Sequence, residues 1–106
     1  ISRSRVDVLP VTHTGNHLIG EIDMMKLRHI LFRTELYHRF SVRQLMSEPP
    51  ALLGVNDPME DVMKAYYSTN AQQLPVITTD KELIGYVSRA HVYSLYRKIV
   101  ADLSTD

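Results

Sequence analysis

This sequence of 106 residues contains no cysteine and no tryptophan, and its twelve basic side chains are balanced by twelve acidic ones. The absence of cysteine excludes disulfide scaffolds, thiolate zinc sites and cysteine nucleophiles. A formal charge of zero leaves no overall field to gather nucleic acid, so we expect no nucleic-acid partner. The apolar runs are only a few residues long, far short of the roughly 20 that span a bilayer, and residues 1–5 show no signal-peptide pattern.

The remaining composition is that of a small globular domain. Hydrophobic residues make up 44% and charged residues 23% of the chain, which excludes a disordered or collagen-like protein. The charge is unevenly distributed: residues 1–47 carry seven basic and four acidic side chains, whereas residues 48–106 carry five and eight. A difference of this size is typical of ordinary solvated surface.

Two stretches of the sequence repeat each other at an offset of 65 residues. Seven of the 23 positions from Leu9 to Leu31 are identical in the stretch from Leu74 to Tyr96. The identical pairs are Leu9/Leu74, Pro10/Pro75, Val11/Val76, Thr14/Thr79, Leu18/Leu83, Ile19/Ile84 and Gly20/Gly85. The shared frame of Leu-Pro-Val, a polar turn, Leu-Ile-Gly and a helix predicts a duplicated supersecondary unit, and two copies are too few for a solenoid.

The second copy predicts the order strand, helix, strand, strand, helix. A short apolar run predicts a strand over residues 51–55. The next residues predict a helix in which Asp57 is the N-cap and Glu60 closes a capping box, and Asn70 is expected to end that helix. Strands are expected over 74–77 and 83–87 around a polar hairpin turn.

Ser88 is expected to cap a final helix with a long apolar stripe. The stripe consists of Val92, Leu95, Tyr96, Ile99, Val100 and Leu103. Tyr93 and Tyr96 lie near one face and could serve dimer packing. The alternative is burial in the core, which we expect more for Tyr96 than for Tyr93, because Tyr93 lies nearer the edge of the stripe.

The first copy shows only the second half of this pattern. Its strands are expected near residues 6–11 and 18–22, with a helix after Asp23. We therefore expect it to be truncated at its N-terminus and to occupy residues 1–33. A linker over 34–47 begins with the polar stretch 34–40, and a capping box at Ser41–Gln44 then opens a short helix through Met46. The second copy fills residues 48–106.

These motifs resemble a tandem pair of CBS domains, also called a Bateman module. The resemblance rests on the two Leu-Pro-Val-(turn)-Leu-Ile-Gly copies, the entry Val42-Arg-Gln-Leu-Met46 and the helix start Asp57-Pro58. It implies an α/β fold in which two βαββα-type repeats pack pseudo-symmetrically, leave two clefts and often pair with a second module. It also implies a regulatory role with adenine nucleotides, ATP, ADP or AMP, as the commonest ligands.

The stretches Ile22–Phe32 and Glu35–Tyr37 most resemble the cytoplasmic tail of prokaryotic ClC-type chloride channels and transporters. This resemblance implies a homodimeric module on the cytoplasmic side of the cell membrane. Its partner would be the membrane-embedded transporter domain of the same parent chain, and the transport chemistry would lie outside this sequence.

Nucleotide-binding members of the family carry Thr-x-x-Asp after the glycine, where the hydroxyl meets phosphate or ribose and the carboxylate accepts from the ribose. This sequence departs from that pattern, with Asp23 and Lys26 in the first copy and Ser88 and His91 in the second. Lys26 is a donor only, so the acceptor for ribose is missing. Asp23 places negative charge where phosphate would approach, so the first cleft is the poorer candidate.

The second cleft is the better candidate, because Ser88, Arg89 and His91 begin a helix whose free N–H groups and dipole suit an anion. The alternative is that Ser88 only caps the helix and Arg89 is solvated. The family pattern implies that adenine would lie against the backbone of Gln72, Gln73, Leu74 and Pro75.

Other chemistry has little support in the sequence. His13 and His17 flank a turn, but no third metal ligand is evident, so we expect no metal site. No phosphate-binding glycine loop and no nucleophile elbow is present, so we expect no enzyme. A ligand-sensing regulatory module and a dimerisation module without ligand therefore remain.

Overall fold

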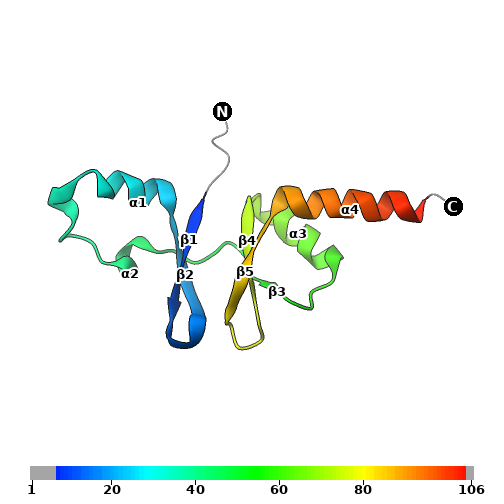
Figure 1. Ribbon diagram of the computed structural model, residues 1–106, viewed down its shortest axis with the longest axis horizontal. Helices are drawn as coiled ribbons and strands as arrows, with labels where there is room; N and C mark the ends of the chain where they lie inside the picture. The colour runs from blue at the N-terminus through cyan, green and yellow to red at the C-terminus, as the bar shows by residue number, and fades with distance from the viewer. Residues whose placement is uncertain (1–6, 105–106) are drawn as a thin grey trace.

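In the computed structural model, the described residues 7–104 form a mixed α/β fold with two sheets and four α-helices, which confirms the predicted fold class (Figure 1). The strands are β1 (Val8–His13), β2 (His17–Asp23), β3 (Leu53–Gly54), β4 (Gln73–Ile77) and β5 (Leu83–Ser88). The helices are α1 (Met24–Leu31), α2 (Val42–Leu45), α3 (Met59–Thr69) and α4 (Arg89–Leu103), with short 3-10 helices at Thr14–Asn16 and Thr34–Leu36. The expected strand start at Val6 lies outside the described residues.

The sequence repeat is also a repeat of strand register. β1 pairs with β2, and β4 with β5, as antiparallel hairpins. Val8 lies opposite Asp23 in the first hairpin, and 65 positions later Gln73 lies opposite Ser88 in the second. Both hairpins contain a bulge at equivalent positions, and β3 adds a parallel partner to β4. The two copies thus share one hairpin geometry.

The two hairpins contact each other through equivalent residues. His17 pairs with Glu82 in an isolated antiparallel bridge, and the Leu18 N–H donates to the Lys81 carbonyl at 3.0 Å. Residues 17 and 82 are equivalent at the offset of 65, so the hairpins are related by an approximate two-fold axis, as the family resemblance implies. Figure 1 shows them side by side with their turns at the same end.

The segment between the repeats packs against the first hairpin. The predicted capping box is present: Ser41 Oγ accepts from the Gln44 N–H at 3.3 Å, and Gln44 Oε1 accepts from the Ser41 N–H at 2.9 Å. Further along, Ser47 and Glu21 exchange two backbone hydrogen bonds of 2.8 and 2.9 Å. The expected polar linker over 34–40 contains a 3-10 helix, and Ser47 fastens the chain to β2.

The predicted N-cap of α3 is wrong. Asp57 does not cap the helix; its Oδ2 accepts from the Gly54 N–H at 2.8 Å, and Pro58 occupies the N-cap position without a side-chain hydrogen bond. This turn also shortens the expected strand over 51–55 to β3, because the chain reverses directly after it. The predicted end of α3 is confirmed, since Asn70 adopts a left-handed conformation with φ 58°.

The main cluster of buried hydrophobic residues lies in the second repeat. It consists of Leu53, Tyr66, Leu74 and Val92, contributed by β3, α3, β4 and α4. Tyr66 is fully buried at 0% exposure, and its hydroxyl donates to the Val87 carbonyl. The buried residues of the first hairpin are Gly20, Glu21 and Ile22 at the end of β2. The radius of gyration of 16.6 Å exceeds the roughly 13 Å expected for a compact domain of this length.

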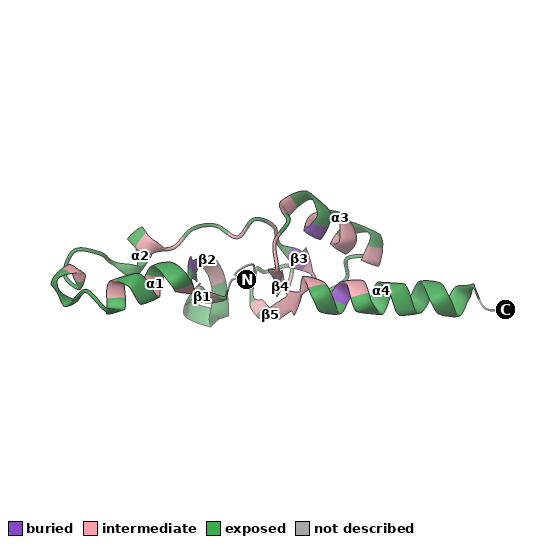
Figure 2. Ribbon diagram, turned by 90° about the horizontal axis from the view of Figure 1, so that it is seen from above, coloured by how far each residue is buried: buried purple, intermediate pink, exposed green. Residues whose placement is uncertain are grey.

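The last helix extends well beyond the sheet (Figure 2), with most of its length exposed. Val92 is buried, whereas Leu95, Tyr96, Ile99, Val100 and Leu103 are 40–79% exposed. The expected order of the two tyrosines is therefore wrong: Tyr93 packs against the core, and Tyr96 is 42% exposed. The predicted cap is confirmed, because Ser88 Oγ accepts from the His91 N–H at 3.1 Å.

Candidate functional site

A cavity of about 340 Å³ lies between the two repeats. Its walls come from both hairpins and from the loop between α3 and β4. The lining residues are Val8, Glu21, Pro50, Asn70, Ala71, Gln72 and Gln73. Residues 8 and 73 are equivalent in the repeat, so the cavity lies beside the approximate two-fold axis.

The four residues expected beside adenine divide into two groups. Gln72 and Gln73 line the cavity between the repeats. Leu74 and Pro75 are fully buried, and their backbones pair with Val87 and Tyr86 across the hairpin. Gln72 and Gln73 therefore line the cavity, whereas Leu74 and Pro75 are buried and paired with β5.

Arg89 is held by two hydrogen bonds to the same loop and by one contact within its own helix. Its N–H donates to the Gln72 carbonyl at 2.8 Å, and its Nη1 donates to Asn70 Oδ1 at 2.7 Å. The guanidinium carbon lies 5.4 Å from the ring centroid of Tyr93, within the range of a cation–π interaction. A second cavity, of about 370 Å³, is lined by Gln72, Arg89, Ala90, Tyr93 and Arg97. Two guanidinium side chains therefore contribute to a pocket that shares Gln72 with the first cavity.

The other expected site residues lie at helix starts. Ser88 uses its hydroxyl oxygen as the cap of α4, and neither Ser88 nor His91 lines the two cavities. Asp23 caps α1, where its Oδ1 accepts from the Met25 N–H at 2.9 Å. Asp23 and Lys26 are both exposed and line neither cavity. Only Arg89, Gln72 and Gln73 among the predicted side chains thus reach these cavities.

Sequence reasoning missed a buried carboxylate in the cavity wall. Glu21 is 8% exposed, and its Oε1 accepts from the Tyr86 hydroxyl at 2.7 Å. Burial raises the pKa of Glu21, and the hydrogen bond from Tyr86 opposes that shift. Burial also raises the pKa of Tyr86, and the Glu21 carboxylate adds to this. The signal was present in the sequence, because 21 and 86 are equivalent positions, each directly after the repeated glycine.

The raised pKa of Glu21 predicts pH-dependent stability. Folding favours the protonated carboxyl of Glu21. The stabilisation that results is fully present below the ordinary pKa of 4.5, and it is lost as the pH rises through the higher folded-state pKa. Glu21→Gln is neutral at every pH and keeps an oxygen for Tyr86. We expect its Tm to exceed that of the native chain at pH 7.5, with a smaller difference near pH 4.5, measured by circular dichroism.

Glu60→Gln, on exposed α3, controls for the loss of one negative charge. A Tm difference between Glu21→Gln and the native chain that is the same at both pH values would contradict the assigned burial of the charge.

The two turn histidines make local contacts. His13 Nδ1 accepts from the Thr14 N–H at 2.8 Å, and His17 Nδ1 lies 3.2 Å from the Thr14 carbonyl oxygen. Within residues 7–104, no cluster of three or more histidine, aspartate or glutamate side chains could hold a metal ion. Both imidazole rings therefore contact the backbone of the turn between β1 and β2.

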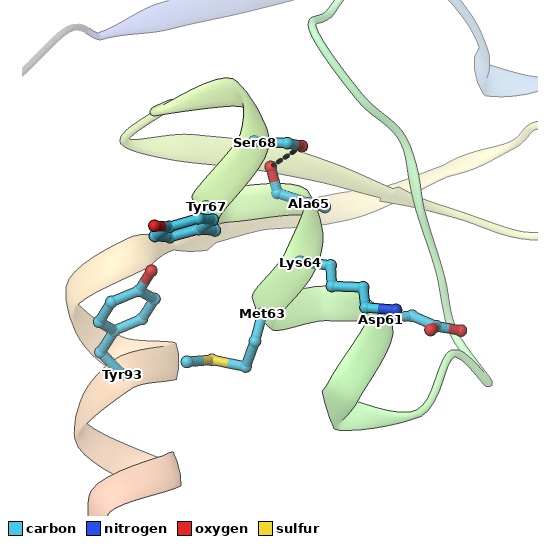
Figure 3. Close-up of a pocket in the computed structure, with 7 residues that line it drawn as sticks. All are labelled: Asp61, Met63, Lys64, Ala65, Tyr67, Ser68 and Tyr93. Carbon is cyan, nitrogen blue, oxygen red and sulfur yellow. Dashed lines mark hydrogen bonds between the residues drawn. The ribbon is translucent and has the colours of Figure 1, made fainter.

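A larger and mostly apolar hollow of about 700 Å³ lies between α3 and α4 (Figure 3). Figure 3 shows Tyr67, Tyr93 and Met63 gathered on one side, with the side chains of Asp61 and Lys64 directed away from them. Tyr67 is 82% exposed. With Tyr67 so exposed, the hollow is an open apolar surface rather than an enclosed site.

A family model described as CBS domain matches residues 42–98. The solved structures that resemble the chain include Staphylococcus aureus OpuCA, at 21% identity and a TM-score of 0.70, covering 92% of this chain and 78% of that one. CBSX2 in complex with AMP is 24% identical with a TM-score of 0.66, covering 87% and 72%. The soluble part of a magnesium transporter is 21% identical with a TM-score of 0.68, covering 86% of this chain and 33% of that one.

No match was found among curated proteins. The identities to solved structures are low, so these similarities establish the fold. No helix within residues 7–104 combines the length and the hydropathy needed to cross a membrane.

Proposed function

Because the chain belongs to the CBS domain family, whose model matches more than half of it, we propose that it is a regulatory module that binds an adenine nucleotide between its two repeats. The observation that carries this proposal is the cavity of about 340 Å³ lined by both hairpins and by Gln72 and Gln73. A ligand there contacts both repeats, so it can bias their relative arrangement. The similar CBSX2 structure contains AMP.

The charges around Gln72 suit a nucleotide. Glu21 lines the cavity on one side of the loop, and Arg89 and Arg97 line the cavity on the other. A phosphate is repelled by the carboxylate and attracted by the guanidinium groups. We therefore propose that the base occupies the cavity between the repeats and that the phosphate lies toward Arg89.

We further propose that the module regulates a membrane transporter to which it is attached, on the cytoplasmic side. The similarity to the soluble part of a magnesium transporter supports a transporter parent. The resemblance of residues 22–32 and 35–37 to the tails of ClC-type channels favours a chloride channel or transporter as that parent. We assign no catalytic step to the module, because CBS pairs regulate the proteins that contain them.

Arg89→Ala tests the nucleotide proposal. We expect the Kd for AMP, measured by isothermal titration calorimetry, to rise about tenfold or more, since a charge-assisted hydrogen bond to phosphate is lost. Arg39→Ala, an exposed arginine of the linker, is the matched control and should bind as the native chain does. Failure of AMP, ADP and ATP to bind the native chain at millimolar concentration would overturn the proposal.

A second candidate function is dimerisation without ligand, which the exposed apolar side chains of α4 favour. Ile99 and Leu103 are 47% and 79% exposed. We expect the native chain to be a dimer by light scattering and Ile99→Glu/Leu103→Glu to be a monomer, because burying two added charges at the interface is costly. Ile84→Glu, on β5 and 57% exposed, should remain a dimer. A native monomer at high concentration would contradict this role for α4.

A further inference from the structure

Glu21 is the one buried acidic side chain of the described residues, and it lies in the wall of the cavity between the repeats. Its carboxylate has two oxygens with different surroundings. Oε1 accepts the hydrogen bond from Tyr86 at 2.7 Å. Within residues 7–104, no hydrogen-bond donor reaches Oε2, and no buried side-chain oxygen or nitrogen lacks a partner. Glu21 is among the residues that line the cavity, so Oε2 is the carboxylate oxygen left for a ligand there.

The Tyr86 contact fixes the direction of this acceptor. Tyr86 belongs to β5 and Glu21 to β2, so the bond spans the contact between the two hairpins. Two backbone hydrogen bonds to Ser47 hold the main chain of Glu21 on its other edge. An acceptor restrained in this way discriminates between ligands that offer a donor and those that do not, because an unpaired carboxylate oxygen is left when the donor is missing.

The other wall groups complement an amino-bearing base. Gln72 and Gln73 carry side-chain amides that offer both donors and acceptors. An aminopurine presents an exocyclic amino donor next to ring nitrogens that accept. A carboxylate suits the amino group, and amide N–H groups suit the ring nitrogens.

We propose that Glu21 is the specificity-determining residue of this cavity and accepts a hydrogen bond from the exocyclic amino group of a 6-aminopurine nucleotide. This inference rests on the proposed function, because it concerns the base of the nucleotide bound there. It adds that the first repeat supplies the group that recognises the base, whereas the proposed phosphate contact comes from Arg89 of the second repeat. Both repeats are then needed for selectivity.

The test compares AMP with purine riboside 5′-monophosphate, which lacks the amino group, by isothermal titration calorimetry. The native chain is expected to bind AMP at least about tenfold more tightly than the analogue, because one charge-assisted hydrogen bond is lost. Glu21→Gln keeps an oxygen for Tyr86 and directs an N–H₂ group toward the cavity. We expect this variant to lose the preference for AMP, and Glu60→Gln to keep it.

The possible outcomes separate the two proposals. If AMP binds the native chain and its preference over the analogue is the same in Glu21→Gln, the role of Glu21 is overturned and the proposed function stands. If neither nucleotide binds the native chain, the proposed function itself fails. Circular dichroism of Glu21→Gln excludes unfolding as the cause of a lost preference.

Discussion

Replacing Leu74 by alanine is expected to lower the free energy of unfolding by about 2–5 kcal/mol, the range for removal of a fully buried leucine side chain. Leu74 is 0% exposed and belongs to the cluster with Leu53, Tyr66 and Val92. The cavity left by the substitution would be enclosed by β3, α3 and α4, which limits collapse of the site. Small domains are stable by only about 5–15 kcal/mol, so this single change removes a large share.

The repeat offers a matched control for this substitution. Leu9 is the equivalent residue in the first hairpin and is 41% exposed. Leu9→Ala removes the same atoms from a partly solvated position, so we expect a much smaller loss. Urea denaturation followed by circular dichroism measures both. Equal losses would contradict the conclusion that the core lies in the second repeat.

Replacing Gly20 by alanine is the second change with a large expected effect, about 1–3 kcal/mol of destabilisation through overpacking. A Cβ atom at Gly20 would lie 2.9 Å from Met46 Sδ and 3.2 Å from the Ser47 carbonyl oxygen. Met46 has a flexible side chain and can move. Ser47 is held by two backbone hydrogen bonds to Glu21, so its carbonyl cannot retreat without breaking that contact.

Gly85 is the equivalent glycine of the second repeat and meets no such obstacle. A Cβ atom there would have no heavy atom within 4 Å. Gly85→Ala is expected to be neutral or slightly stabilising, because alanine in a strand loses less backbone entropy on folding than glycine does. The same urea titration compares the two variants. Similar losses at both positions would show that the linker does not constrain Gly20.

Much of the fold could be predicted because the two copies obey one local pattern. The Leu-Pro-Val and Leu-Ile-Gly segments gave the correct hairpins, and Ser41 and Ser88 cap helices as expected. Asp57 was misassigned because an aspartate before proline can either cap the helix or close the preceding turn. In this chain Asp57 closes the preceding turn, and the sequence alone does not distinguish this role from capping the helix.

The site was only partly predictable, for a different reason. The family pattern predicts Gln72 and Gln73 and the helix start predicts Arg89, and these three residues line the cavities. Glu21 was missed although residues 21 and 86 are equivalent in the repeat, because the equivalence indicates a contact only once the two hairpins are known to meet across their axis. The exposure of Tyr96 was missed likewise, since a helical stripe does not reveal where the neighbouring sheet ends.

The Glu21–Tyr86 contact also bears on how such a chain can arise. These residues occupy equivalent positions, so in an association of two identical half-length chains each would face its own copy across the axis. Two facing carboxylates repel each other, and burial makes that repulsion worse. Joining the halves in one polypeptide lets the two positions mutate independently, and an acid can then meet a phenol. An acid–phenol pair at these two positions therefore requires the halves to differ, and a chain with identical halves could not form it.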